Sequence, residues 1–170
     1  MLRENFIKRM NAICGLTTTG SSNVYYFTYG SNMDRDQMLL RAPSAALEGF
    51  ARLSDFRLVF NKRGRDGTAK ANIQSSVENG AFVLGGLYRM PESEFDRLRS
   101  FELGYFVTII EVDRNGAQVL ARTFIAEANS VFMGRPYKDY IGHILKGAES
   151  LDLPEEYRFS LSKCAGELNL

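Results

Sequence analysis

The chain has 170 residues, 45% of them hydrophobic and 12% aromatic, so it can bury one sizeable core. Its 21 basic and 20 acidic side chains leave a net charge of +1, which gives no electrostatic case for a nucleic acid or a membrane surface as partner. A small-molecule ligand is therefore expected, and the oligomeric state is left open. Cys14 and Cys164 are too few and too far apart to indicate a disulfide framework or a metal site, so neither a metal nor a cofactor is expected.

The first 22 residues carry no strong signal of any kind. They mix charged and apolar residues, and the small-residue cleavage site of a signal peptide is missing. No window of the sequence approaches the roughly 18 apolar residues of a transmembrane helix. We expect residues 1–22 to be a loosely ordered N-terminal extension, residues 23–170 to form a single domain, and the protein to be cytoplasmic.

The most informative stretch runs from residue 24 to residue 33. It begins with β-branched and aromatic residues, which predict a buried strand, and it breaks at Gly30-Ser31-Asn32, a polar turn. Acidic residues and then apolar ones follow, so a helix is expected between Asp34 and Pro43. A helix start after such a turn leaves backbone N–H groups unpaired, and these can bind a carboxylate or an oxyanion. The four residues alone also fit an ordinary strand-to-helix connection.

The middle of the chain predicts mostly strands. Residues 50–60 form one strand, and two antiparallel hairpins follow, because Asn-Gly pairs supply the positive φ angles of two-residue turns. The first hairpin pairs residues 71–77 with 81–90, and the second pairs residues 106–113 with 117–126. Gly85-Gly86 inside a strand indicates a bulge or a close backbone approach, as a curved or barrel-like sheet would need.

Three further helices are expected. The first spans residues 91–102, with proline and acidic residues in its first turn. The second begins at Pro136 and ends at Gly147, and the third runs from about residue 153 to Ser162. Between the predicted strands, Lys62, Arg63, Arg65 and Lys70 form a basic loop; such loops are most often solvated, but this one could meet a second carboxylate on a substrate.

Several of these segments resemble the γ-glutamylcyclotransferase (AIG2-like) family. The resemblance covers roughly residues 25–161 and is carried by the order of short motifs rather than by any one of them. These motifs are Tyr29-Gly30-Ser31-Asn32, Arg41-Ala42-Pro43-Ser44-Ala45, Ala71-Asn72-Ile73, Gly86-Leu87-Tyr88, Pro136-Tyr137-x-x-Tyr140, Gly147-Ala148 and Leu153-Pro154-x-x-Tyr157. The resemblance implies an α+β fold with a mixed, barrel-like sheet and surrounding helices.

The resemblance also implies an activity. Members of the family release 5-oxoproline from γ-glutamyl amino acids or amines, because the substrate's α-amine attacks its own γ-carbonyl. The expected ligand is therefore a small molecule with a γ-glutamyl or other carboxylate group. The expected binding residues are Tyr29, Gly30, Ser31, Asn32, Met33, Arg99 and Tyr105. The family's general base is a glutamate in a Leu-Asp-x-x-Glu-Gly pattern.

The sequence does not carry this glutamate at the position where the pattern expects it. Aligning the pattern on Phe95-Asp96-Arg97-Leu98 places Arg99 where the glutamate is expected, and a guanidinium remains protonated and has no acceptor. Glu102 is the candidate replacement, and the alternative is that it is a solvated carboxylate paired with Arg99. Shifting the alignment by three residues would put Glu102 at the glutamate position. Asp96 would then have no counterpart in the pattern, and Tyr105 would no longer match the tyrosine of the family. Two functions follow: a cyclotransferase that uses Glu102, or a catalytically silent binding module in which Arg99 pairs with a ligand carboxylate.

Overall fold

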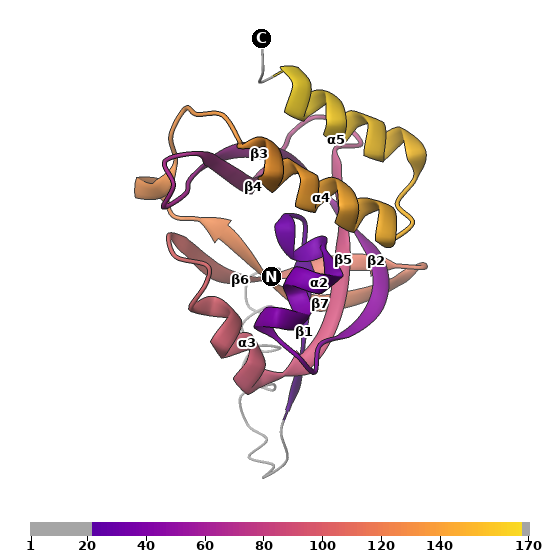
Figure 1. Ribbon diagram of the computed structural model, residues 1–170. Helices are drawn as coiled ribbons and strands as arrows, with labels where there is room; N and C mark the ends of the chain where they lie inside the picture. Colours follow the sequence, from indigo (N-terminus) through magenta and orange to yellow (C-terminus); the bar gives the residue numbers. More distant parts are fainter. Residues whose placement is uncertain (1–21, 168–170) are drawn as a thin grey trace, which may run out of the picture.

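The protein is described by a computed structural model that covers residues 22–167 (Figure 1). The predicted N-terminal extension, residues 1–22, lies outside the described residues except for Ser22. No helix in the described part of the chain is long and apolar enough to cross a membrane.

Five strands close into a barrel. In spatial order they are β1 (Asn23–Thr28), β5 (Phe82–Pro91), β2 (Ala46–Ser54), β6 (Tyr105–Arg114) and β7 (Ala117–Ala126). All neighbours pair antiparallel except β1 and β7, which close the barrel in parallel at Tyr26 and Arg122. The mixed, barrel-like sheet expected from the sequence is therefore confirmed.

One of the two predicted hairpins forms and the other does not. β6 and β7 pair around Asn115 and Gly116, whose φ angles of 54° and 84° are those of the expected turn. The prediction that residues 71–77 pair with residues 81–90 is wrong. Instead, β4 (Ala69–Ser75) pairs with β3 (Phe56–Arg63) as a separate hairpin, while β5 lies between β1 and β2. The basic loop closes this hairpin, because Gly64 N–H donates to the Thr68 carbonyl at 2.8 Å.

Gly85 is the close backbone approach that the sequence predicts. A Cβ atom there would lie 2.2 Å from the Thr28 carbonyl oxygen and 2.9 Å from the Phe27 ring. Only glycine therefore lets β5 cross this part of β1, which is the strand that leads into the predicted anion site.

Within residues 22–167, four α-helices and two short 3-10 helices surround the sheets (Figure 1). They are η1 (Ser31–Met33), α2 (Arg35–Arg41), α3 (Glu92–Arg99), η2 (Ala128–Ser130), α4 (Lys138–Ser150) and α5 (Glu155–Glu167). The predicted stop at Gly147 is wrong, because α4 continues to Ser150. Gly147 instead lets α4 pack on η1: a Cβ there would lie 2.4 Å from the Met33 carbonyl carbon.

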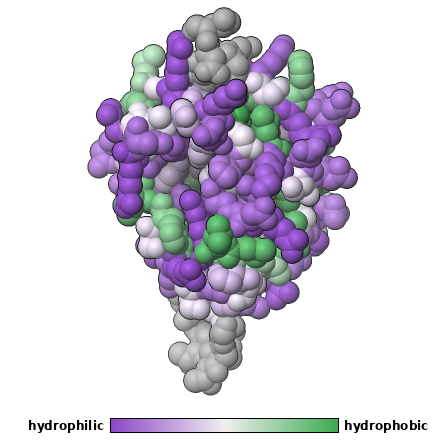
Figure 2. Space-filling model, in the orientation of Figure 1, coloured by the Kyte–Doolittle hydropathy of each residue, from purple (hydrophilic) through white to green (hydrophobic). Residues whose placement is uncertain are grey.

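Apolar side chains gather in two clusters. The larger fills the space between the barrel, the β3–β4 hairpin, α4 and α5, and the smaller lies where α2 and α3 cover β1 and β5. The face of the molecule in Figure 2 is largely hydrophilic, with separate apolar patches between polar side chains. The segment around Gly30 lies between the two clusters, since Tyr29 and Met33 belong to the larger one and Tyr26 to the smaller.

Candidate active site

The predicted strand, turn and helix start are all present. β1 ends at Thr28, η1 turns the chain, and Asp34 caps α2 by accepting the Asp36 N–H at 3.2 Å. The first two N–H groups of η1, those of Ser31 and Asn32, donate to no backbone carbonyl in the described chain. The backbone therefore leaves these two N–H groups unpaired at the start of η1.

Two adjoining pockets open beside this turn. The inner pocket has a volume of about 30 Å³, room for roughly two water molecules. It is lined by Tyr26, Thr28, Tyr29, Gly30, Ser31, Asn32, Ala71, Glu102, Tyr105, Phe124 and Tyr140. The outer pocket has a volume of about 540 Å³ and is lined by Ser31, Gln37, Arg41, Lys62, Gly64, Arg65, Asp66, Lys70, Ser100, Phe101, Glu102, Leu103, Tyr105 and Tyr140. A ligand that places one terminal group in the inner pocket extends naturally into the outer one.

Glu102 reaches the inner pocket because the helix before it ends early. The sequence predicts a helix through residue 102, but α3 ends at Arg99. The next N–H groups, from Ser100 to Glu102, bond three residues back instead of four, which tightens the chain into successive turns. These turns carry Glu102 off the helix surface and toward Asn32.

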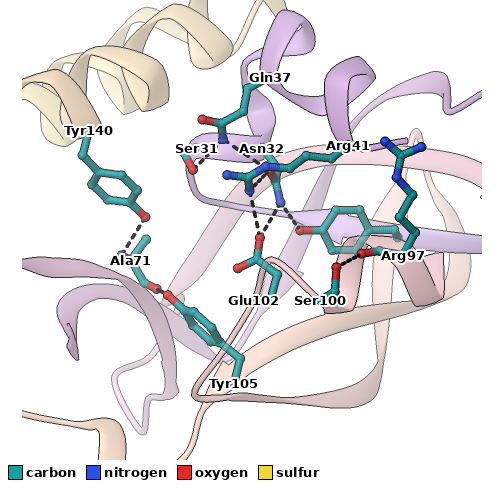
Figure 3. Close-up of polar contacts among 11 residues, drawn as sticks. Ser31, Asn32, Gln37, Arg41, Ala71, Arg97, Ser100, Glu102, Tyr105 and Tyr140 are labelled. Carbon is teal, nitrogen blue, oxygen red and sulfur yellow. Dashed lines mark hydrogen bonds and ion pairs between the residues drawn. The ribbon is translucent and has the colours of Figure 1, made fainter. Parts of the chain in front are cut away.

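Two side chains hold the Glu102 carboxylate from one side (Figure 3). Its Oε1 accepts from Asn32 Nδ2 at 2.9 Å and from Arg41 Nη1 at 3.2 Å. Oε2 makes no hydrogen bond to any described residue, and in Figure 3 it points to the side where Tyr105 and Tyr140 lie. One oxygen is thus fixed and the other is free to exchange a proton with a ligand.

The surroundings of Glu102 favour its protonated form more than water does. Burial raises the pKa of this carboxyl above its ordinary value, while Arg41, the Asn32 hydrogen bond and Lys62 oppose the rise. The side chain is only 16% exposed. A carboxylate with a raised pKa is a stronger base than one in water, which suits proton abstraction near neutral pH.

Arg99 does not take the place expected for it. Its guanidinium is 59% exposed and pairs with Asp96 at 3.6 Å, one turn back along α3. Arg99 lines neither the inner nor the outer pocket, but it lines a third hollow of about 550 Å³ to which Glu102 and Tyr105 also contribute. Arg99 and Glu102 have different ion-pair partners, Asp96 and Arg41. The pairing of Glu102 with Arg99 considered for the sequence is corrected to a pairing with Arg41.

Two residues of α2 belong to the site and were missed in the sequence. Gln37 Nε2 donates to Ser31 Oγ at 2.8 Å, and Arg41 Nη1 donates to Asn32 Oδ1 at 2.8 Å as well as to Glu102. Their position could have been predicted, because residues four apart on a helix share a face and both residues lie on the helix that follows the turn. Together they fix the side chains of the Ser31-Asn32 turn.

Three tyrosines form the wall opposite Glu102. Tyr105 donates its hydroxyl to the Ala71 carbonyl at 2.6 Å, and the Tyr140 hydroxyl accepts the Ala71 N–H at 2.9 Å. The Tyr29 hydroxyl donates to the Phe124 carbonyl. Burial raises the pKa of all three phenols, so they stay neutral. Tyr140, which belongs to the Pro136-Tyr137-x-x-Tyr140 motif, lines both pockets.

The other sequence candidates divide clearly. Tyr29, Gly30, Ser31, Asn32, Glu102 and Tyr105 all line the inner pocket, whereas Met33 does not and is buried in the core against α4. The Met33 side chain is carried away from the pocket because it follows the turn into η1. Among the described residues no group of three or more His, Cys, Asp or Glu side chains could hold a metal ion.

Comparisons with known proteins agree with this architecture. Residues 82–161 match the model of the AIG2-like family. The chain is 31% identical over 155 residues to gamma-glutamylcyclotransferase of Homo sapiens, covering 86% of this chain and 81% of that protein. It is 33% identical over 147 residues to gamma-glutamylcyclotransferase of Mus musculus, with coverages of 80% and 76%.

A solved structure of gamma-glutamyl cyclotransferase has the same fold. It superimposes with a TM-score of 0.75 at 29% sequence identity, over 83% of this chain and 87% of that one. The fold and the sequence similarity both extend over most of the two proteins, and the chain therefore belongs to the γ-glutamylcyclotransferase family.

Proposed function

We propose that this protein is a γ-glutamylcyclotransferase that releases 5-oxoproline from γ-glutamyl amino acids or amines, with Glu102 as general base. The observation that carries the proposal is the Glu102 carboxylate, fixed at Oε1 by Asn32 and Arg41 and free at Oε2 beside the inner pocket. No cofactor is required for this reaction, because the nucleophile and the leaving group belong to the same substrate.

The turn at Gly30 is suited to hold the glutamyl end of such a substrate. The N–H groups of Ser31 and Asn32 offer two donors to a carboxylate or to the oxyanion that forms at the γ-carbonyl. Gly30 keeps this surface open, since a Cβ there would already contact the Ala71 Cβ and the Tyr140 hydroxyl at 3.4 Å. A bent γ-glutamyl chain bound here brings its α-amine toward its own γ-carbonyl.

Glu102 would then handle both proton transfers. Oε2 takes a proton from the α-ammonium, whose pKa in water is roughly 7.7–8.0, so that the amine can attack the γ-carbonyl carbon. The new C–N bond closes the five-membered ring, the original amide C–N bond breaks, and Glu102 passes its proton to the departing nitrogen. The second proton lost by the ring nitrogen also goes to the released amine, which leaves as an ammonium. The pKa of Glu102, raised by burial, makes it better able to accept the first proton.

The alternative of a silent binding module depended on Arg99 lying inside the pocket and pairing with a ligand carboxylate. The exposed Arg99–Asp96 pair lies outside both pockets, while a carboxylate occupies the wall where a base is needed. The geometry therefore supports the enzyme better than the binding module.

The products distinguish cyclisation from hydrolysis or inactivity. The purified protein is incubated with γ-glutamyl-alanine in ¹⁸O-water, and 5-oxoproline, glutamate and alanine are quantified by mass spectrometry. The proposal predicts equal amounts of 5-oxoproline and alanine, with no ¹⁸O in the 5-oxoproline. Labelled glutamate would indicate a hydrolase instead, and a folded protein that forms no product from γ-glutamyl dipeptides or amines would contradict the proposal.

A further inference from the structure

The outer pocket receives the part of the substrate that leaves. It shares Ser31, Glu102, Tyr105 and Tyr140 with the inner pocket, so the two spaces are continuous. The inner pocket, at about 30 Å³, has room for a terminal group only, whereas the outer pocket, at about 540 Å³, has room for the rest of a substrate. If the glutamyl end binds at the Gly30 turn, as proposed above, the leaving residue lies in the outer pocket.

The charged side chains of the outer pocket do not balance. Two carboxylates line it, and each already has a cationic partner: Glu102 pairs with Arg41 at 3.2 Å and Asp66 with Lys70 at 2.7 Å. Hydrogen bonds from the Lys70 ammonium and the Thr68 N–H lower the pKa of Asp66 to about 2, so that pair persists at neutral pH. Two further cations line the same pocket, Lys62 and Arg65, and neither has an ion pair with a described residue.

Lys62 is the more unusual of the two cations. Its side chain is 7% exposed, although lysine is rarely buried without a partner. Its ammonium lies 4.9 Å from the centre of the Tyr105 ring and has no hydrogen bond or ion pair within the described chain. Gly104, at φ +79°, leaves space for its stem, because a Cβ there would lie 3.1 Å from Lys62 Cε. Burial lowers the pKa of Lys62, while the charges of Glu102 and Asp66 oppose that fall without forming an ion pair with it.

We propose that the outer pocket selects γ-glutamyl compounds whose leaving residue is itself acidic, with Lys62 as the specificity-determining residue and Arg65 as a second anion contact. A leaving aspartate or glutamate carries two carboxylates, which matches the two unpaired cations. A neutral leaving residue carries one carboxylate and leaves one cation uncompensated. The proposal rests on the proposed function, because it assumes that the glutamyl end binds at the Gly30 turn.

The test compares two nearly isosteric substrates that differ by one charge, γ-glutamyl-glutamate and γ-glutamyl-glutamine. We expect the wild-type protein to prefer the glutamate compound by about tenfold or more in kcat/KM, because a charge-assisted contact to a desolvated ammonium exceeds an amide contact. Lys62→Met should remove most of that preference, chiefly through KM. Arg65→Ser, an exposed position with little risk to folding, should reduce it in part. Arg63→Met is the matched control, because Arg63 lies in the same loop but lines neither pocket and stacks on Phe132.

Equal kcat/KM for the two substrates in the wild-type protein, or an unchanged preference in folded Lys62→Met and Arg65→Ser, would overturn the proposal. If neither substrate is turned over, calorimetry with the same two compounds still decides it. Tighter binding of γ-glutamyl-glutamate that is lost in Lys62→Met would support the acidic subsite while the proposed catalysis fails. Equal or undetectable binding of both compounds would overturn the subsite as well.

Discussion

Replacing Arg41 by methionine should shift the pH dependence of catalysis while leaving the base in place. Arg41 donates to Glu102 Oε1 at 3.2 Å and opposes the rise in the pKa of that carboxyl that burial causes. Methionine keeps much of the apolar stem and removes the charge. Glu102 then becomes harder to ionise, so a higher pH is needed before it can accept a proton.

The size of the shift follows from the distance. Unit charges separated by 3.2 Å attract by about 1 kcal/mol in water and by about 5 kcal/mol at an effective dielectric constant near 20. A quarter of the Arg41 side chain is exposed, so we take the lower part of this range, about 1–3 kcal/mol, or about 1–2 pH units.

The assay is kcat/KM for 5-oxoproline release between pH 5 and 7.5, where the substrate amine stays protonated. The midpoint of the rise should move upward by that amount in Arg41→Met, so that the loss of rate is largest at low pH. Arg99→Met is the control, and its midpoint should not move, because Arg99 pairs with Asp96 at the surface. A uniform loss at every pH in Arg41→Met, with an unchanged midpoint, would show that Arg41 acts on the substrate and not through Glu102.

Three further predictions concern the turn and its support. Gly30→Val should weaken binding of 5-oxoproline by about tenfold or more in calorimetry, and Gly30→Ala should weaken it less. The reason is that a Cβ at this position already touches Ala71 and Tyr140 at 3.4 Å, and valine adds two methyl groups to it. Equal affinities of the wild-type protein and Gly30→Val would remove the turn from the binding site. Gly147→Ala should lower the free energy of unfolding by about 1–3 kcal/mol, because its Cβ would lie 2.4 Å from the Met33 carbonyl carbon. Gly142→Ala in the same helix, whose Cβ would have nothing within 4 Å, should raise the free energy of unfolding by about 0.5–1 kcal/mol. Equal effects of the two substitutions in urea denaturation would contradict the close packing of α4 on η1. Burial alone would raise the pKa of Asp34, but hydrogen bonds with His143, Lys146 and the Asp36 N–H lower that pKa overall. Ionised Asp34 therefore stabilises the fold above the pKa of an unfolded aspartate, and this stabilisation is lost as the pH falls through the lower pKa of the folded state. Asp34→Asn should therefore destabilise the protein at pH 7 and differ less from the wild type below pH 4; a difference independent of pH would exclude this charge effect.

Local chemistry allowed much of the fold to be predicted. The β1–η1–α2 segment, the Asn115-Gly116 hairpin and the close approach at Gly85 all follow from short-range rules on turns, caps and glycine. The failures concern long-range partners. Residues 71–77 are strand-forming, but nothing local to them determines that β3 and not β5 is their neighbour. Glycine is common at the C-terminal end of helices, which is why Gly147 predicts an end there. Its close contact with η1 explains why α4 has a glycine at this position and continues past it.

The site was predictable in part for the same reason. The turn residues follow from the sequence around Gly30, but the relative placement of Arg99 and Glu102 depends on where α3 ends. A three-residue difference in that end decides which side chain faces Asn32, and helix ends are weakly encoded in sequence. Arg41 was missed because its partners, Asn32 and Glu102, are 9 and 61 residues away. The structure places the Glu102 carboxylate, and not Arg99, against Asn32.

The most direct test of Glu102 as the base is the initial rate of 5-oxoproline release by Glu102→Gln. Glutamine can still accept from Asn32 and Arg41 but cannot take a proton, so the rate should fall by about 10²–10⁴-fold. Because burial raises the pKa of Glu102, its ionised form costs stability as the pH rises through that value, and Glu102→Gln should unfold at pH 8 no more easily than the wild type. Arg99→Gln should keep nearly the full rate. A folded Glu102→Gln variant with a rate within tenfold of the wild type would contradict the assignment of Glu102 as the base.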